Sequence, residues 1–124
     1  MKVRGIRGAI CASENSPLAI HTATRELVDT IVELNEIDVD DVASILFTMT
    51  ADLTAAFPAE AVRSRPGWQW VPLMCATELP IENSKSRCIR VLMHVNTHKT
   101  QEALQHVYLG EAIVLRPDLA QKNV

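Results

Sequence analysis

The stretch Cys88–Val95 constrains the fold of this chain most, because its apolar side chains alternate with the two-residue period of a β-strand. One face of such a strand would carry Ile89, Val91, Met93 and Val95. The opposite face would carry Cys88, Arg90, Leu92 and His94. We therefore expect a strand within a sheet, with Arg90 pointing out of one face of that sheet.

A second arginine, Arg7, lies in the similar stretch Val3–Ile10. Because a guanidinium group stays charged at any ordinary pH, burying it is costly unless an anion or several hydrogen-bond acceptors contact it. Arginines in strands also occur on solvated faces and in structural ion pairs. Further polar groups border other apolar segments, at Arg63, Glu78, Tyr108 and Arg116. Their recurrence in a short chain favours a pocket that binds an anion.

Length and charge limit the class of function. The chain has 124 residues, enough for one domain with a real core. Its net charge is -3 and no run of lysine and arginine forms a basic stripe, which argues against an electrostatic nucleic-acid binder.

The three cysteines, Cys11, Cys75 and Cys88, lack C-x-x-C spacing, so neither a disulfide framework nor a zinc site is indicated. No apolar signal core follows Met1, and no stretch is long enough to cross a membrane. We expect a cytoplasmic protein in reducing surroundings.

Periodicity and capping residues predict one long helix. Ser16 followed by Pro17 is typical of a helix start, and apolar residues at helical spacing continue to about Asn35. One stripe of this helix should cover a sheet. Shorter helices are expected over Ala59–Arg63, with Pro58 at a first helical position, and around 101–106.

Strands are expected over Lys2–Cys11, Val42–Thr50, Trp68–Met74, Cys88–Val95 and Ile113–Arg116. Pro72 would place the third of these at an edge or a bulge, because proline cannot donate to a ladder. Trp68 and Trp70 would share one strand face, and Cys75–Ile81 would leave the sheet. Residues 1–117 would form a single domain, with 118–124 as a mobile tail.

Five short motifs are spread in this order along nearly the whole chain: R-G-I-R-G-A from Arg4, F-P-A from Phe57, C-I-R-V from Cys88, H-V-Y-L from His106 and V-L-R-P-D-L from Val114. Together they closely resemble the monofunctional chorismate mutases of the trimeric, sheet-containing class. The strand content excludes the all-helical class of chorismate mutases.

The resemblance implies a ferredoxin-like α+β fold, in which one long helix packs on a mixed β-sheet. Three chains would form a pseudo-barrel core with an active site at each interface. The implied reaction is the Claisen rearrangement of chorismate to prephenate, in the shikimate pathway that supplies phenylalanine and tyrosine. It needs no cofactor and no metal. The implied partners are substrate, product and two further copies of the chain, without nucleic acid or membrane.

The resemblance also assigns roles to residues. Arg90 would contact the ether oxygen of the substrate, and Arg7 would hold a carboxylate. Glu78 would accept a hydrogen bond from the ring hydroxyl. Tyr108 would donate to a carboxylate. The further substrate-binding residues implied are Phe57, Ala59, Arg63, Leu73, Met74, Cys75, Ala76, Thr77, Leu115 and Arg116.

Two positions depart from the family pattern. Glu60 stands where a lysine is often found, and Met74 where a threonine is often found. We expect Glu60 to point outward or to pair with Arg63, three residues later on a short helix. Two other functions stay open: a trimeric imine or enamine deaminase, and a non-catalytic domain that binds anions.

Overall fold

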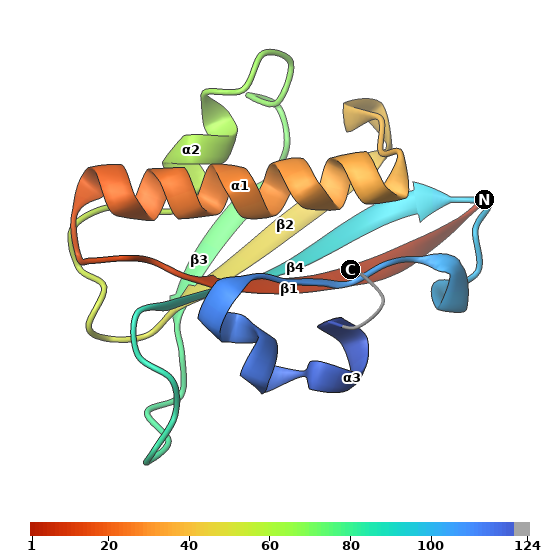
Figure 1. The fold of residues 1–124 in the computed structure, drawn as a ribbon. Coiled ribbons are helices and arrows are strands. Elements are labelled where there is room, and N and C mark those ends of the chain that lie inside the picture. The colour runs from red at the N-terminus through yellow and green to blue at the C-terminus, as the bar shows by residue number, and fades with distance from the viewer. Residues whose placement is uncertain (121–124) are drawn as a thin grey trace.

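The fold is a five-stranded sheet with one long helix on one of its faces (Figure 1). The computed structural model describes residues 1–120. The strands are β1 (Lys2–Cys11), β2 (Val42–Met49), β3 (Leu73–Thr77), β4 (Cys88–Thr97) and β5 (Val107–Tyr108), in the order β3-β2-β4-β1-β5. β4 is antiparallel to β1 and β2, whereas β3 and β5 add in parallel at the two edges. This mixed sheet confirms the expected α+β class.

The long helix α1 (Pro17–Asn35) begins as its sequence predicts. The Ser16 side chain accepts a hydrogen bond from the Ala19 N–H at 3.1 Å, and proline occupies the first turn. The helix ends at Glu36, which has a left-handed backbone with φ of 52°. None of the described helices is long and apolar enough to cross a membrane.

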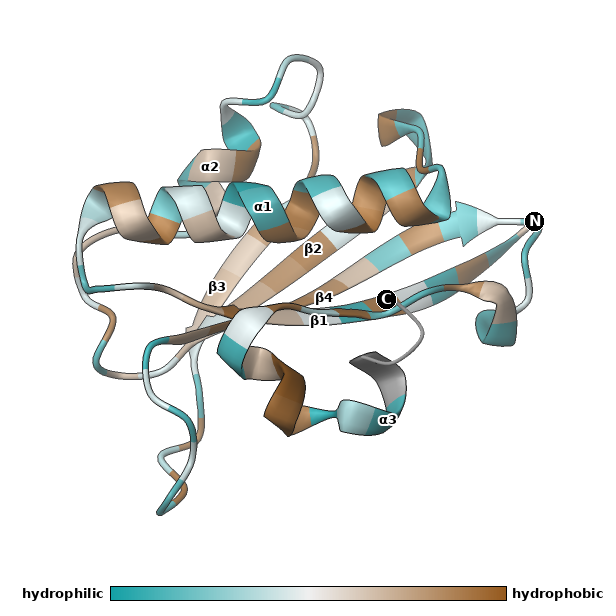
Figure 2. Cartoon of the chain, in the orientation of Figure 1, coloured by the Kyte–Doolittle hydropathy of each residue, from teal (hydrophilic) through white to brown (hydrophobic). Residues whose placement is uncertain are grey.

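The core lies between α1 and the sheet. The largest side chains buried there include Ile20, Leu27 and Ile31 of α1 and Ile6, Phe47, Ile89 and Met93 of the strands. Figure 2 shows apolar residues along β2 and β4 beneath the helix. Burial alternates along β4 as expected, because Ile89, Val91, Met93 and Val95 all point toward α1.

The opposite side of the sheet, here called the open face, carries the alternate residues of the same strands. Arg7, Ala9 and Cys11 of β1 lie there, with Thr48 of β2 and Arg90 of β4. Part of this face, beside β1 and β5, is covered by the 3-10 helix η3 (Gly110–Leu115) and by α3 (Pro117–Ala120) (Figure 1). The face over β2 and β4 has no helical cover within residues 1–120.

The prediction of a strand over Trp68–Met74 is wrong for residues 68–72. Residues 68–71 form tight turns, in which the Trp68 N–H donates to Arg65 and the Val71 N–H donates to Trp68. The two tryptophans therefore do not share a face: Trp68 is 5% exposed and Trp70 is 84% exposed. The edge strand instead begins after Pro72, so Cys75–Thr77 lie in the sheet and not outside it.

The C-terminal part of the chain also differs from expectation. Ile113–Arg116 is not a strand, because Gly110 has φ of 56° and turns the chain into η3. The helix expected around 101–106 is only the 3-10 turn η2 (Gln101–Ala103). Of the tail expected over 118–124, residues 118–120 belong to α3, and 121–124 lie outside the described residues. The domain boundary after residue 117 stays a prediction.

The remaining short elements are α2 (Ala59–Arg63), as expected, and the 3-10 turn η1 (Val39–Asp41). Pro58 is the N-cap residue of α2 and not its first helical residue. α2 packs against α1, on the opposite side of the sheet from η3 and α3 (Figure 1).

Candidate active site

Arg90 lies near the start of β4, between Ala9 of β1 and Thr48 of β2. Its Nε atom is 3.0 Å from Oε1 of Glu78, the first residue after β3. The Nε atom is buried, but its N–H does not point at that oxygen and donates no hydrogen bond to any described residue. A charged donor is therefore held in place by a carboxylate on the open face of the sheet.

Glu78 is itself fixed from two sides. Its backbone N–H donates to the Met49 carbonyl at 2.8 Å, which extends the pairing of β2 and β3 by one residue. The Thr48 hydroxyl donates to the same carboxylate oxygen that faces Arg90. The position of the carboxylate is thus set by the sheet edge, and the position of the guanidinium follows from it.

A pocket of about 270 Å³ lies beside this pair on the open face, here called the arginine pocket. Its lining is Arg7, Leu46, Thr48, Glu78, Arg90, Val91 and Leu92. The structure therefore brings together the three residues expected to be catalytic: Arg7, Glu78 and Arg90. Two guanidinium groups in apolar surroundings suit a small organic anion.

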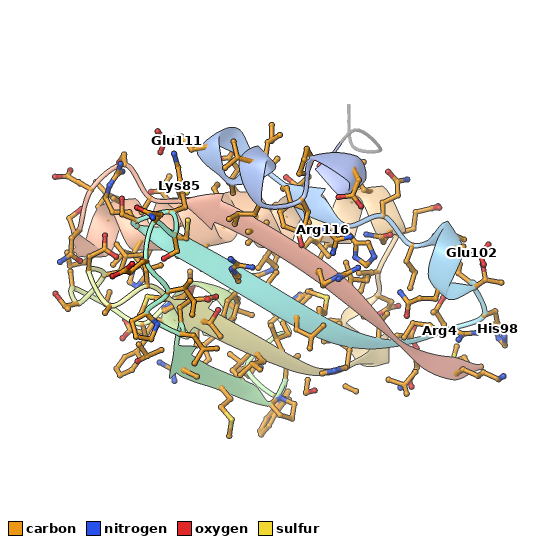
Figure 3. All side chains as sticks on the ribbon, turned by 90° about the horizontal axis from the view of Figure 1, so that it is seen from below. Arg4, Lys85, His98, Glu102, Glu111 and Arg116 are labelled. Carbon is orange, nitrogen blue, oxygen red and sulfur yellow. The ribbon has the colours of Figure 1, made fainter. Side chains whose placement is uncertain are left out.

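Tyr108, Leu115 and Arg116 lie on the same side of the sheet. Tyr108 pairs with Ala9 and packs in a small cluster with Ala112, and Leu115 packs against that cluster. The open face is viewed in Figure 3, where Arg116 is labelled. Its guanidinium donates two hydrogen bonds to Asp118, at 3.2 and 3.0 Å, and this pairing raises the pKa of Arg116. Arg116 is thus already bound to a carboxylate of its own chain.

The other expected substrate-binding residues lie around a second cavity. Cys75 pairs with Phe47, whose side chain is in the core, so Cys75 faces the helix side of the sheet. A pocket of about 270 Å³, here called the edge pocket, is lined by Met49, Thr50, Ala51, Leu53, Thr54, Phe57, Cys75, Ala76 and Thr77. Leu73 is on the same face as Cys75, and Ala59 and Arg63 belong to α2 nearby.

Within one chain, the structure does not bring these two groups of residues together. The arginine pocket opens on one face of the sheet, while Leu73, Cys75 and Thr77 point to the other. Met74 lies beside Leu46 on the open face and is 69% exposed. The expected site residues therefore form two partial sites on opposite faces of the sheet, one on the open face over β2, β4 and β1 and the other on the helix side at the β3 edge.

Comparisons with known proteins identify the family. The family model of chorismate mutase type I matches residues 3–119. The chain belongs to the type I chorismate mutases. It is 52% identical over 118 residues to chorismate mutase AroH of Thermus thermophilus, covering 94% of this chain and 96% of that protein. It is 42% identical over 120 residues to chorismate mutase AroH of Bacillus subtilis, covering 97% and 94%.

The fold agrees with a solved chorismate mutase structure. A chorismate mutase from Clostridium thermocellum superposes with a TM-score of 0.86 at 45% identity, covering 89% of this chain and 97% of that one.

Sequence reasoning on this type I chorismate mutase missed two features of the site. Thr48 orients Glu78, and the alternation of β2 could have found it, because Thr48 shares a face with Leu46 and not with Phe47. Glu60 was expected to point outward or to pair with Arg63. Its side chain is partly exposed, and its Oε2 lies 3.4 Å from Nε2 of His21 on α1 and not beside Arg63, because α2 packs across α1.

Proposed function

We propose that this chain converts chorismate to prephenate in the arginine pocket, as a cytoplasmic enzyme of phenylalanine and tyrosine biosynthesis. The observation that carries the proposal is the Arg90–Glu78 pair, in which a carboxylate holds a cation beside an apolar cavity. Membership of the type I chorismate mutases supports the same reaction.

The rearrangement places few demands on the protein. A carbon–oxygen bond breaks while a carbon–carbon bond forms in the same molecule, so no nucleophile and no proton carrier is needed. The protein must hold a flexible dianion in a compact chair-like shape and stabilise the negative charge that grows on the ether oxygen. Arg90 supplies that stabilisation, because its guanidinium is already oriented by Glu78 before the charge develops.

The other residues of the open face bind and orient the substrate. Arg7 binds one carboxylate, and Tyr108 donates to a carboxylate from the side of β5. The Glu78 carboxylate accepts a hydrogen bond from the ring hydroxyl of the substrate while it stays paired with Arg90. Arg116 contributes to the attraction of the dianion at the mouth of the site, where Asp118 now binds it.

The remaining substrate-binding residues come from a second copy of the chain, in a trimer with a pseudo-barrel core. The division of the expected site between the arginine pocket and the edge pocket supports this arrangement, because a neighbouring chain could place its edge pocket over the arginine pocket. Apolar side chains exposed near the β3 edge, including Met74, Phe57 and Trp70, support burial between chains.

Replacing Arg90 tests the proposed reaction. In Arg90→Gln the neutral side chain removes the charge that stabilises the ether oxygen, and the loss of one preorganised donor costs about 2.7–4 kcal/mol. We expect kcat to fall by about 10²–10³-fold, far more than KM rises, in a continuous absorbance assay of chorismate loss. Circular dichroism would establish that the variant is folded.

Arg25→Gln is the matched control, because Arg25 is an exposed arginine on α1, away from both pockets. It should keep wild-type turnover. Unchanged turnover in Arg90→Gln would overturn the role of Arg90. Tight binding of prephenate by the wild type without any turnover would instead identify an anion-binding domain.

A further inference from the structure

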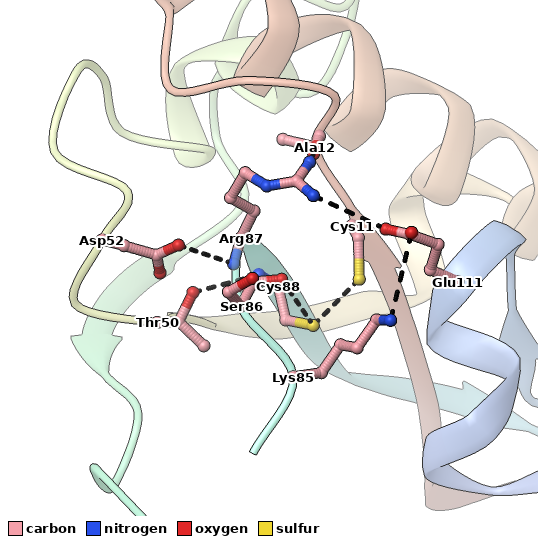
Figure 4. Close-up of polar contacts among 9 residues, drawn as sticks. All are labelled: Cys11, Ala12, Thr50, Asp52, Lys85, Ser86, Arg87, Cys88 and Glu111. Carbon is pink, nitrogen blue, oxygen red and sulfur yellow. Dashed lines mark hydrogen bonds and ion pairs between the residues drawn. The ribbon is translucent and has the colours of Figure 1, made fainter. Parts of the chain in front are cut away.

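Cys11 and Cys88 face each other across β1 and β4, close to the end of the open face (Figure 4). Their Sγ atoms are 3.0 Å apart although the residues are 77 positions apart in the sequence. The Ala12 N–H donates to the Arg87 carbonyl at 2.8 Å, which makes Cys11 and Cys88 a non-hydrogen-bonded pair of the antiparallel ladder.

This kind of pair has the backbone spacing that a disulfide requires. The Cα atoms of a non-hydrogen-bonded antiparallel pair are about 4.5 Å apart. Disulfides span Cα distances of about 4.4–6.8 Å. The two sulfur atoms can therefore bond after small side-chain rotations, without any change in the register of the strands.

The backbone around the pair is held on both sides. The Cys88 N–H donates to the Thr50 hydroxyl at 3.0 Å, and the Thr50 N–H donates to the Cys88 carbonyl at 3.0 Å. The Arg87 N–H donates to Asp52 at 2.9 Å, and the Arg87 guanidinium donates to the Ala12 carbonyl. These contacts, drawn in part in Figure 4, keep the two cysteines opposite each other.

The two thiols differ in their access to solvent. Cys88 is 1% exposed, whereas Cys11 is partly exposed. Burial, and then the hydrogen bond with Cys11, raise the pKa of the Cys88 thiol to about 12, while Arg90 and Lys85 act in the opposite direction. A reagent in solution therefore reaches the Cys11 sulfur first, and the buried Cys88 sulfur lies next to it as the second thiol.

We propose that Cys11 and Cys88 form a reversible intrachain disulfide by exchange with a small-molecule disulfide such as oxidised glutathione. The Cys11 thiolate attacks one glutathione sulfur, forms a mixed disulfide and releases one reduced glutathione. The Cys88 sulfur then loses its proton, attacks the Cys11 sulfur and releases the second glutathione. Two protein thiols are oxidised, one glutathione disulfide is reduced, and both protons end on glutathione.

The consequence for the molecule is a covalent link between β1 and β4, two residues from Ala9 and from Arg90, which are themselves paired in the ladder. The inference does not rest on the proposed reaction, because it depends only on the strand register and on the sulfur geometry. Cys75 has no part in it, since it lies on β3 and faces the other side of the sheet.

The test uses full-length Cys75→Ser, which retains only the two proposed thiols. The folded protein is equilibrated with excess oxidised glutathione at mildly alkaline pH, then its free thiols are counted and its peptides mapped by mass spectrometry. We expect loss of both free thiols, no retained glutathione, and a peptide from β1 linked to one from β4 of the same chain. Cys11→Ser/Cys75→Ser should instead keep its buried thiol free.

A second readout is thermal. The link closes a loop of 77 residues, and by restricting the unfolded chain it should raise Tm by roughly 5–10 °C. Reduction with dithiothreitol should reverse the shift, and the double variant should show none.

Three results would overturn the proposal. The first is that folded Cys75→Ser keeps both thiols free, although oxidised glutathione modifies them in the unfolded chain. The second is stable glutathione adducts in place of the link. The third is a disulfide between chains, seen as a dimer band on a non-reducing gel.

Discussion

At the scale of single residues, Glu60 on α2 carries a negative charge where the family resemblance leads us to expect a lysine. Its carboxylate lies 3.4 Å from His21 and is partly exposed. An acid near the entrance repels a dianion, so Glu60→Lys should lower KM, and more so at low salt where charges are less screened. Steady-state assays at two ionic strengths would measure this.

Glu33→Lys makes the same charge change on an exposed part of α1 and serves as the control. It should alter KM little. An unaltered KM for Glu60→Lys at low ionic strength would place Glu60 away from the path of the substrate.

At the scale of elements, the packing of α1 on the sheet depends on Gly8. A Cβ atom there would lie 2.9 Å from the Val107 carbonyl oxygen and 3.1 Å from side-chain atoms of Leu27 and Val91. Because the first neighbour is backbone of β5, the strand itself would have to shift. Gly8→Ala should lower the free energy of unfolding by about 1–3 kcal/mol, measured by urea unfolding at fixed protein concentration.

Gly5→Ala, in the same strand, is the matched comparison, because its Cβ would meet only Leu92 at an ordinary 3.5 Å. It should leave stability nearly unchanged. Equal stability of the two variants would show that β5 can move away from β1 without cost.

Elements with a regular period were predictable, and those set by tertiary contacts were not. β1, α1 and β4 follow from alternation or from the Ser16–Pro17 cap, which are local signals. The aromatic residues at 68 and 70 suggest a strand, but Pro66, Gly67 and Pro72 confine that segment to turns. Ile113 and Val114 have strand propensity, yet Gly110 directs them into a 3-10 helix.

The same division holds for the candidate site. Arg7 and Arg90 were predicted to share an anion pocket because each interrupts an apolar strand, and the structure places both in one cavity. The alternation of β2 places Thr48 on the face of Arg90, but its contact with Glu78 and the contact of Glu60 with His21 were not predictable, because each joins elements distant in sequence.

At the scale of the whole molecule, the shared site predicts recovery of activity in mixed assemblies. Arg90→Gln disables the arginine pocket, and Phe57→Asp puts a carboxylate on the edge pocket at a residue that is 61% exposed. Each variant alone should be nearly inactive. The two variants are then unfolded and refolded together in equal amounts. About three quarters of random trimers contain both variants, and each of these has one intact active site out of three. The mixture should therefore regain roughly a quarter of wild-type activity.

Separately refolded samples combined afterwards, under conditions where chains do not exchange, provide the control and should stay inactive. No recovery in the co-refolded sample would mean that a single chain supplies the whole site. Sedimentation would report the assembly state directly, and a strictly monomeric active enzyme would contradict the trimer.

The strand order also determines when this sheet can form during synthesis. β1 is the earliest element of the chain, but its two neighbours are β4, which begins at Cys88, and β5, which begins at Val107. On the ribosome, the strand that carries Arg7 therefore emerges with both edges unpaired, and it has no partner in the sheet until the residues from Cys88 onward have been translated. The sheet cannot be complete before Val107 and Tyr108 have left the ribosome.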